Sequence, residues 1–175
     1  MEAIAQLENN YFLFKAGLID FQVCIDWAIE RLSQDQEGDD LEIVLLAAAT
    51  EVEEVAPLVE QIIARYCGKD VLDEQLVAGK YVVMLRDAYL QGQETVESID
   101  AKLAKLYNVL GYPGWLTMLT RNCEYATDIP AFEEPFEKEF AYIANLWSAA
   151  SNTVEFYAQY SRAISNQHDA TLTPL

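Results

Sequence analysis

Apolar residues recur at intervals of three and four along most of the chain, which is the spacing of one face of an α-helix. The first such stripe contains Ile4, Leu7, Tyr11 and Phe14, and it stops before Gly17, a residue type that often ends a helix. The clearest stripe lies towards the other end of the chain, at Phe136, Phe140, Ile143, Trp147, Ala150, Val154, Tyr157 and Ile164. It predicts one long, continuous C-terminal helix of about 40 Å.

Between these two stripes, apolar runs and capping residues mark further elements. Residues 41–49 are nearly all apolar, which predicts a short buried helix. Thr50 followed by Glu53 is a capping-box pattern, so we expect another helix to begin there, with Pro57 in or just before its first turn. Residues 123–135 lack a helical spacing and are expected to be irregular.

The composition favours one helical domain. Seven Gly and five Pro in 175 residues are about half the usual share, which leaves too few turn residues for a β-sandwich. The chain contains no internal repeat and no linker-like segment. The expected fold is an all-α, single-domain antiparallel bundle of about six to eight helices over residues 1–165, followed by a frayed tail over 166–175.

The chain is strongly acidic, because 29 acidic and 11 basic residues give it a net charge of −18. Fourteen of the acidic residues and two of the basic residues lie in the first 60 positions. This charge repels nucleic acid and anionic membranes, so we expect binding to neither. The acidic excess has two interpretations: it maintains solubility, or it forms a face that meets a basic protein partner.

Sequence features also indicate a compartment. No apolar run approaches the roughly 18 residues of a membrane span, and the first residues lack the basic start of a signal peptide. We therefore expect a cytoplasmic protein. Cys24, Cys67 and Cys123 are odd in number and widely spaced, which indicates reduced, mostly buried thiols and leaves any redox role open.

Residues that carry most enzyme chemistry are scarce. His168 is the single histidine and falls in the expected tail, so neither a Ser-His-Asp nor a Cys-His arrangement is expected. The acidic run 35–40 fails as an EF-hand, because Asp40 stands where the loop needs glycine and Leu46 where it needs glutamate. The chain is therefore expected to be non-enzymatic, with no metal and no cofactor.

Candidate partner-binding residues are carboxylates from the first third of the chain and one tryptophan. The carboxylates are Asp35, Glu37, Asp39, Asp40, Glu42, Glu51, Glu53 and Glu54. Trp115 follows a Pro-Gly turn, which makes it the best candidate for an exposed apolar anchor, although burial in the core is the favoured interpretation. Trp27 and Trp147 lie on helical stripes and are expected in the core.

Three segments carry a resemblance to a protein family. They are residues 11–19 (YFLFKAGLI), 24–28 (CIDWA) and 106–113 (LYNVLGYP). Together they resemble a group of small, all-helical bacterial proteins of uncharacterised domain type, some of which are assigned as immunity proteins of polymorphic toxin systems. The resemblance implies a helical fold and a toxin as the partner, and it implies no catalytic residue.

Three functions follow as hypotheses. The first is an immunity or inhibitor protein that neutralises a cognate basic toxin by binding it. The second is an acidic helical interaction or scaffold module with another partner, or one that associates with itself. The third is an enzyme that uses only carboxylates and tyrosines, and the scarcity of histidine makes it the least favoured.

Overall fold

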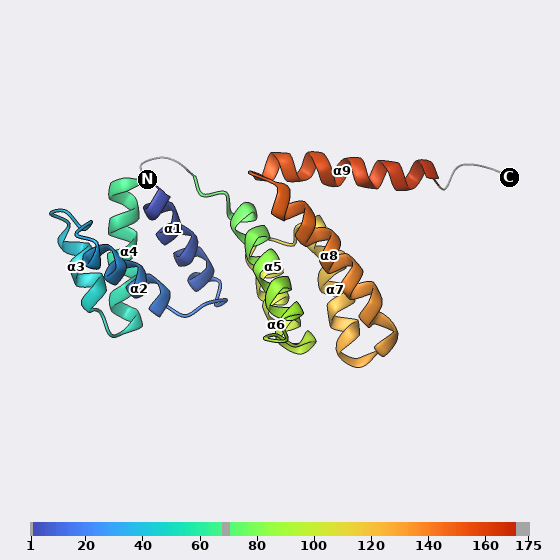
Figure 1. Cartoon of the computed structure of the whole chain (residues 1–175), viewed down its shortest axis with the longest axis horizontal. Coiled ribbons are helices and arrows are strands. Elements are labelled where there is room, and N and C mark those ends of the chain that lie inside the picture. The colour runs from blue at the N-terminus through green and yellow to red at the C-terminus, as the bar shows by residue number, and fades with distance from the viewer. Residues whose placement is uncertain (1, 68–70, 171–175) are drawn as a thin grey trace. The chain divides into compact units, whose positions relative to one another are not determined.

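Figure 1 shows the computed structural model of the chain, which describes residues 2–67 and 71–170. These residues form nine α-helices and one short 3₁₀ helix, and no strand occurs among them. The prediction of an all-α fold is therefore confirmed, with one helix more than the expected range. The helices group into two compact units, Met1–Leu72 and Asp73–Leu175. The single domain expected over 1–165 stays a prediction.

The N-terminal unit contains four of the described helices. They are α1 (Glu2–Lys15), α2 (Gln22–Ser33), α3 (Leu41–Ala48) and α4 (Val52–Tyr66). In this unit α2 packs on α3, and α4 packs on both α1 and α3. The side chains buried between them include Leu7, Cys24, Ile25, Trp27, Ile43, Leu46, Val55, Val59 and Ile62. The core position expected for Trp27 is thus confirmed.

The C-terminal unit contains the other described helices. They are α5 (Glu74–Leu90), α6 (Val96–Val109), α7 (Gly114–Asp128), η1 (Pro130–Phe132), α8 (Glu133–Ala149) and α9 (Thr153–Ala170). In this unit α8 packs on α5, α7 and α9, and α6 packs on α7. Its largest fully buried side chains are aromatic: Trp115, Trp147, Phe136, Phe140 and Phe156. Trp147 therefore lies in the core, as its stripe predicted.

The continuous helix expected over 136–164 is wrong, because two helices, α8 and α9, cover this stretch. α8 stops before Ala150, whose backbone is extended (φ −77°, ψ 138°). The ammonium group of Lys80 on α5 donates hydrogen bonds to the carbonyl oxygens of Trp147, Ser148 and Ala150, at 2.6, 3.2 and 2.8 Å. Carbonyls at a helix end lack partners within the helix. A contact from a distant part of the chain therefore stabilises the end of α8.

The start of α9 depends on a second contact with α5. Asp73, the N-cap residue of α5, accepts hydrogen bonds from the Thr153 amide at 3.0 Å and the Thr153 hydroxyl at 2.5 Å. One carboxylate thus stabilises the first turns of two helices. The α9 backbone is helical to Ala170, although a frayed tail was expected from residue 166, and residues 171–175 lie outside the described part of the chain.

Two local expectations are also wrong. Residues 123–135 are largely helical, because α7 continues to Asp128 and buries Cys123 on its inner face, and α8 already begins at Glu133. Pro57 lies inside α4, beyond the first turn, since this helix begins at Val52.

Candidate functional site

The short helix α3 exposes a large part of its apolar surface. Residues 41–49 were expected to form a buried helix, but Leu41 is 62% exposed and Leu45 is 47% exposed. Only the opposite face, with Ile43 and Leu46, packs into the core of the N-terminal unit. Exposed apolar side chains that gather on one helix are unusual on a soluble surface and often mark a binding site.

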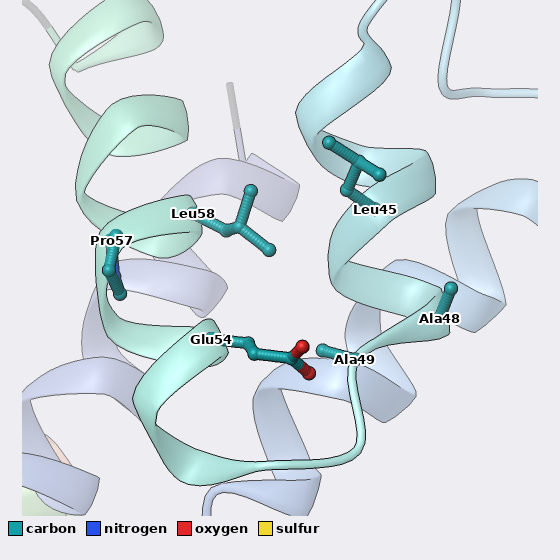
Figure 2. Close-up of a pocket in the computed structure, with 6 residues that line it drawn as sticks. All are labelled: Leu45, Ala48, Ala49, Glu54, Pro57 and Leu58. Carbon is teal, nitrogen blue, oxygen red and sulfur yellow. The ribbon is translucent and has the colours of Figure 1, made fainter.

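A groove of about 420 Å³ lies between this exposed face and α4. Leu45 on α3 and Leu58 on α4 face the space between the two helices, as Figure 2 shows. The residues that line the groove are Leu45, Ala48, Ala49, Glu54, Pro57 and Leu58. Ala48 and Ala49 contribute only small methyl side chains to the lining of the groove.

One end of the groove is formed by the tight connection between α3 and α4. The Glu54 carboxylate lies beside Ala49 at this end (Figure 2), where its Oε2 accepts hydrogen bonds from the amides of Thr50 and Glu51 at 3.1 and 3.4 Å. These bonds are part of a capping box between Glu51 and Glu54. The capping box predicted from Thr50 and Glu53 is therefore shifted by one residue.

An arginine joins the two helices beyond the other end of the groove. Arg65, in the last turn of α4, forms an ion pair with Asp40, with 2.8 Å between the guanidinium nitrogen and the carboxylate oxygen. It also forms a bidentate ion pair with the Glu42 carboxylate, with nitrogen–oxygen distances of 2.9 and 3.0 Å. Asp40 is the N-cap residue of α3 and accepts a hydrogen bond from the Glu42 amide at 3.1 Å. The antiparallel helices are thus joined at both ends, which holds the groove open before any partner binds.

The electrostatics of this contact explain why Asp40 remains charged although it is buried. Burial raises the pKa of this carboxyl, but hydrogen bonds from Tyr66 and from the Glu42 amide, together with the Arg65 charge, outweigh burial and hold the pKa below its usual range. Hydrogen bonding to Glu42 and the charge of Asp40 raise the pKa of Arg65 in turn. Asp40 and Glu42 are therefore occupied within the chain, and the prediction that they face a partner loses its support.

The other predicted carboxylates divide into two kinds. Asp35, Asp39, Glu51 and Glu53 are exposed, and none of them forms an ion pair with another residue that the structure describes. Glu37 is half-buried. Glu54 is exposed but is used in the capping box at the groove. The structure thus leaves Asp35, Asp39 and Glu53 exposed and without an ion pair to another described residue, whereas Glu51, like Glu54, accepts a backbone hydrogen bond in the capping box.

These carboxylates belong to a stretch of the sequence without positive charge. Residues 32–64 contain nine acidic residues and no Lys, Arg or His. The first basic residue after this stretch is Arg65, and its charge is directed at Asp40 and Glu42. The stretch that contains the groove therefore carries an excess of negative charge, which would attract a positively charged partner.

Trp115 is the candidate site residue that the structure places elsewhere. Its side chain is fully buried in the C-terminal unit, which confirms the favoured core position, and its candidacy as an exposed anchor is wrong. The indole N–H donates a hydrogen bond to Gln75 at 3.1 Å, and the ring packs edge-on against Trp147 and Phe156. The indole gains both a polar partner and aromatic neighbours inside the core, which is why it does not remain at the surface.

The potential metal ligands in the described part of the chain are scattered, and two of its cysteine side chains are buried. No group of three or more His, Cys, Asp or Glu side chains comes together there to hold a metal ion. Burial raises the pKa of the Cys24 thiol to about 11 and that of Cys123 to about 12, so both are protonated at neutral pH and are poor nucleophiles. The side chain of His168 lies outside the described residues. No helix among those described has the length and apolar character needed to cross a bilayer.

The groove itself was missed at the sequence level. The apolar run 41–49, which contains Leu45, predicts a buried helix, and the spacing of apolar residues does not single out Leu58. The signal that could have found the site is the combination of that apolar run with the absence of any basic residue over 32–64. Arg65 is the first cation after this stretch. Its position indicates an ion pair with the carboxylates at the start of α3.

Comparison of the chain with protein-family models, with curated proteins and with solved structures finds no match.

Proposed function

We propose that the chain is a non-enzymatic protein-binding protein that captures a basic partner through its N-terminal unit. The observation that carries this proposal is the stretch 32–64, which combines exposed carboxylates that have no ion pair with a described residue and an apolar groove. Asp35, Asp39, Glu51 and Glu53 supply the negative charge, and α3 supplies the apolar surface.

The two parts of this surface have different roles in binding. Negative charge accelerates the encounter with a positively charged partner and selects against acidic competitors. Apolar contacts in the groove then slow dissociation, since most affinity differences between related complexes lie in the dissociation rate. The expected result is binding that begins electrostatically and weakens as salt screens the exposed carboxylates.

The resemblance to immunity proteins suggests the class of partner. We propose that the partner is a cognate bacterial toxin with a basic surface and that the chain neutralises it in the cytoplasm by covering that surface. Segments 11–19 and 24–28, which carry the resemblance, lie in or beside α1 and α2 of the N-terminal unit. They form part of the scaffold on which α3 and α4 rest.

A second candidate is an acidic scaffold module that associates with itself or with a partner that is not a toxin. The exposed apolar face of α3 favours it, because two copies could bury that face against each other. The negative charge around the groove opposes such a pairing, since it would bring like charges together. We therefore place the basic partner first.

The test is affinity capture from a lysate of the source organism, with the full chain as bait at low and moderate salt. The charge-reversed variant D39K/E53K alters two exposed carboxylates of the stretch 32–64, and D87K/E124K makes the same change in net charge on the C-terminal unit. A basic protein retained by the wild type and by D87K/E124K, but lost from D39K/E53K, supports the proposal. Equal retention by all three baits contradicts it.

The toxin assignment has its own test. The captured protein is expressed in cells with and without the chain, and growth is measured. Growth arrest that the wild-type chain relieves, and that D39K/E53K relieves less well, supports an immunity protein. A captured protein that is harmless when expressed alone favours the scaffold candidate.

A further inference from the structure

We propose that the groove between α3 and α4 receives an amphipathic helix of the partner, with an apolar stripe that enters the groove and Lys or Arg residues beside it. This inference rests on the proposed function and names the segment of the partner that this site recognises. It specifies what enters the groove, whereas the proposed function states only that a basic partner is captured by the surface of the stretch 32–64.

The apolar lining fits side chains presented at helical spacing. Leu45 and Leu58 project from opposite walls (Figure 2), and Ala48 is a further lining residue with a small side chain. On α3, Leu41, Leu45 and Ala48 lie at spacings of four and three residues, so they share one face of that helix. A third helix laid along two antiparallel helices can place its own side chains at spacings of three and four between them.

The groove is built before it is filled. Arg65 joins α4 to the start of α3 through Asp40 and Glu42, and the capping box of Glu54 fixes the connection at the opposite end. A site held in its bound shape spends less free energy on ordering when the partner arrives. Two helices fixed at both ends can therefore bind a short segment.

Charge complementarity identifies the polar side of that segment. Glu51, Glu53 and Glu54 lie at the start of α4 beside the groove, and Asp39 lies just before α3. The basic residue at the far end of α4, Arg65, is already paired. Lys and Arg side chains beside the apolar stripe of the segment can approach these exposed carboxylates, of which Glu53 forms no ion pair with a described residue, and the stretch 32–64 contains no Lys, Arg or His to repel them.

The same observations disfavour other occupants. A small-molecule site needs several polar groups that converge on the ligand. The one charged side chain lining this groove is Glu54, and its Oε2 already accepts two backbone hydrogen bonds. A second copy of the N-terminal unit would bring its own carboxylates against Glu51 and Glu53. A basic helical segment of another protein meets neither difficulty.

The experiment titrates the full chain with synthetic 18-residue helical peptides while the leucine methyl signals of the protein are followed by NMR. The main probe has leucines at positions i, i+3, i+4 and i+7 and lysines on its other faces. One control peptide replaces the lysines with glutamate, and a second replaces the leucines with glutamine. We expect saturable shifts of the Leu45 and Leu58 methyls with the main probe, and affinities about tenfold or more weaker for both controls.

Two variants separate the groove from general surface attraction. Leu45→Ser removes one wall, while Ala48→Leu fills the groove and adds apolar surface without changing the charge. Both should weaken binding of the main probe about tenfold. Leu90→Ser, at an exposed leucine on the C-terminal unit, is the matched control and should leave the affinity unchanged.

Four results would overturn the inference: equal binding of the glutamine peptide, equal binding of the glutamate peptide, unchanged or tighter binding by A48L, or methyl shifts that change with protein concentration alone and reveal a second copy in the groove. The outcome differs from that of the capture experiment. A basic partner that depends on Asp39 and Glu53 but leaves Leu45 and Leu58 unaffected would retain the proposed function and reject the groove as its site.

Discussion

Gly79 lies so close to Trp147 that a Cβ atom at position 79 would overlap the indole ring. The close approach lets α5 pack directly on α8, where the Trp147 ring stacks on Phe156 with centroids 3.7 Å apart. The next residue on α5, Lys80, donates its hydrogen bonds to the end of α8. Two neighbouring residues of α5 therefore help to set both the packing of α8 and its length.

The variant Gly79→Ala should strongly destabilise the C-terminal unit. The added methyl group must displace a buried indole, and overpacking of this kind costs about 1–3 kcal/mol or more. The free energy of unfolding, measured by urea titration, gives the effect. Gly114→Ala is the matched control, because a Cβ there meets no atom within 4 Å, and it should change the stability little. Equal stability of the two variants would show that α8 does not approach α5 as described.

The variant Lys80→Met should weaken the end of α8. It keeps an unbranched side chain but removes the ammonium group that donates to Trp147, Ser148 and Ala150, which should cost about 1–2 kcal/mol of unfolding free energy. Lys138→Met is the control, since Lys138 makes one exposed ion pair with Glu134 on the same helix. Faster amide exchange at the last turn of α8 in K80M would locate the effect, and unchanged exchange there would contradict it.

Acid should destabilise the C-terminal unit partly through Asp73. Burial raises the pKa of Asp73, but hydrogen bonds from Thr153 and from the Leu76 amide outweigh burial and lower the pKa below the usual value of 3.8. A carboxyl whose pKa is lower in the folded state stabilises the fold above its unfolded pKa, and this stabilisation is lost as the pH falls through the folded pKa. The contribution of Asp73 to the free energy of unfolding should therefore be constant near neutral pH and decline below about pH 4.

The variant Asp73→Asn tests this pH dependence. It should be less stable than the wild type at pH 7, and the difference should shrink as the pH falls through the folded-state pKa of the wild-type carboxyl, which then gains its proton. Urea unfolding at a series of pH values provides the comparison. Asp87→Asn, at an exposed position on α5, should follow the wild-type curve. A difference in unfolding free energy between D73N and the wild type that does not change with pH would contradict the hydrogen bonds that Asp73 accepts from Thr153 and the Leu76 amide.

Arg65→Met should loosen the N-terminal unit and the groove together. The change leaves Asp40, which is 3% exposed, without its cation. We expect a lower melting temperature and weaker binding of the leucine–lysine peptide. Asp40→Asn in the same chain should recover part of the loss, because it removes the buried charge. Arg162→Met is the control at an exposed arginine of α9. Unchanged peptide binding by R65M would mean that the ion pair does not shape the groove.

The helices of this chain were predictable from local spacing, whereas the positions of their ends depend on capping contacts, some of them from distant residues. The stripe through Phe136, Phe140, Ile143 and Trp147 correctly predicts the buried face of α8. The break after Ala150 has a local signal, because Asn152 accepts a hydrogen bond from the Glu155 amide and Glu155 accepts one from the Ser151 amide, as N-terminal caps do. Lys80 and Asp73, which also stabilise the two helix ends there, lie about half the chain away. Periodicity describes which face is buried, and it cannot show such tertiary caps.

The candidate site was predicted in part for a related reason. The concentration of carboxylates is visible in the sequence, and exposed Asp39 and Glu53 agree with the predicted face. Which of these carboxylates form ion pairs depends on where Arg65 lies in the folded chain, and the sequence does not show that position. Likewise, an apolar run such as 41–49 does not reveal that one side of a short helix stays uncovered, since hydrophobicity alone does not say which neighbours are present.

The most direct test of the central claim is amide hydrogen exchange of the full chain, alone and in complex with the basic protein that it captures. We expect the backbone amides of α3 and of the first turns of α4 to exchange more slowly on binding, while the amides of α5 to α8 exchange at unchanged rates. Protection confined to the C-terminal unit, or a complex without any change in α3 and α4, would contradict the claim that the acidic stretch 32–64 forms the binding surface.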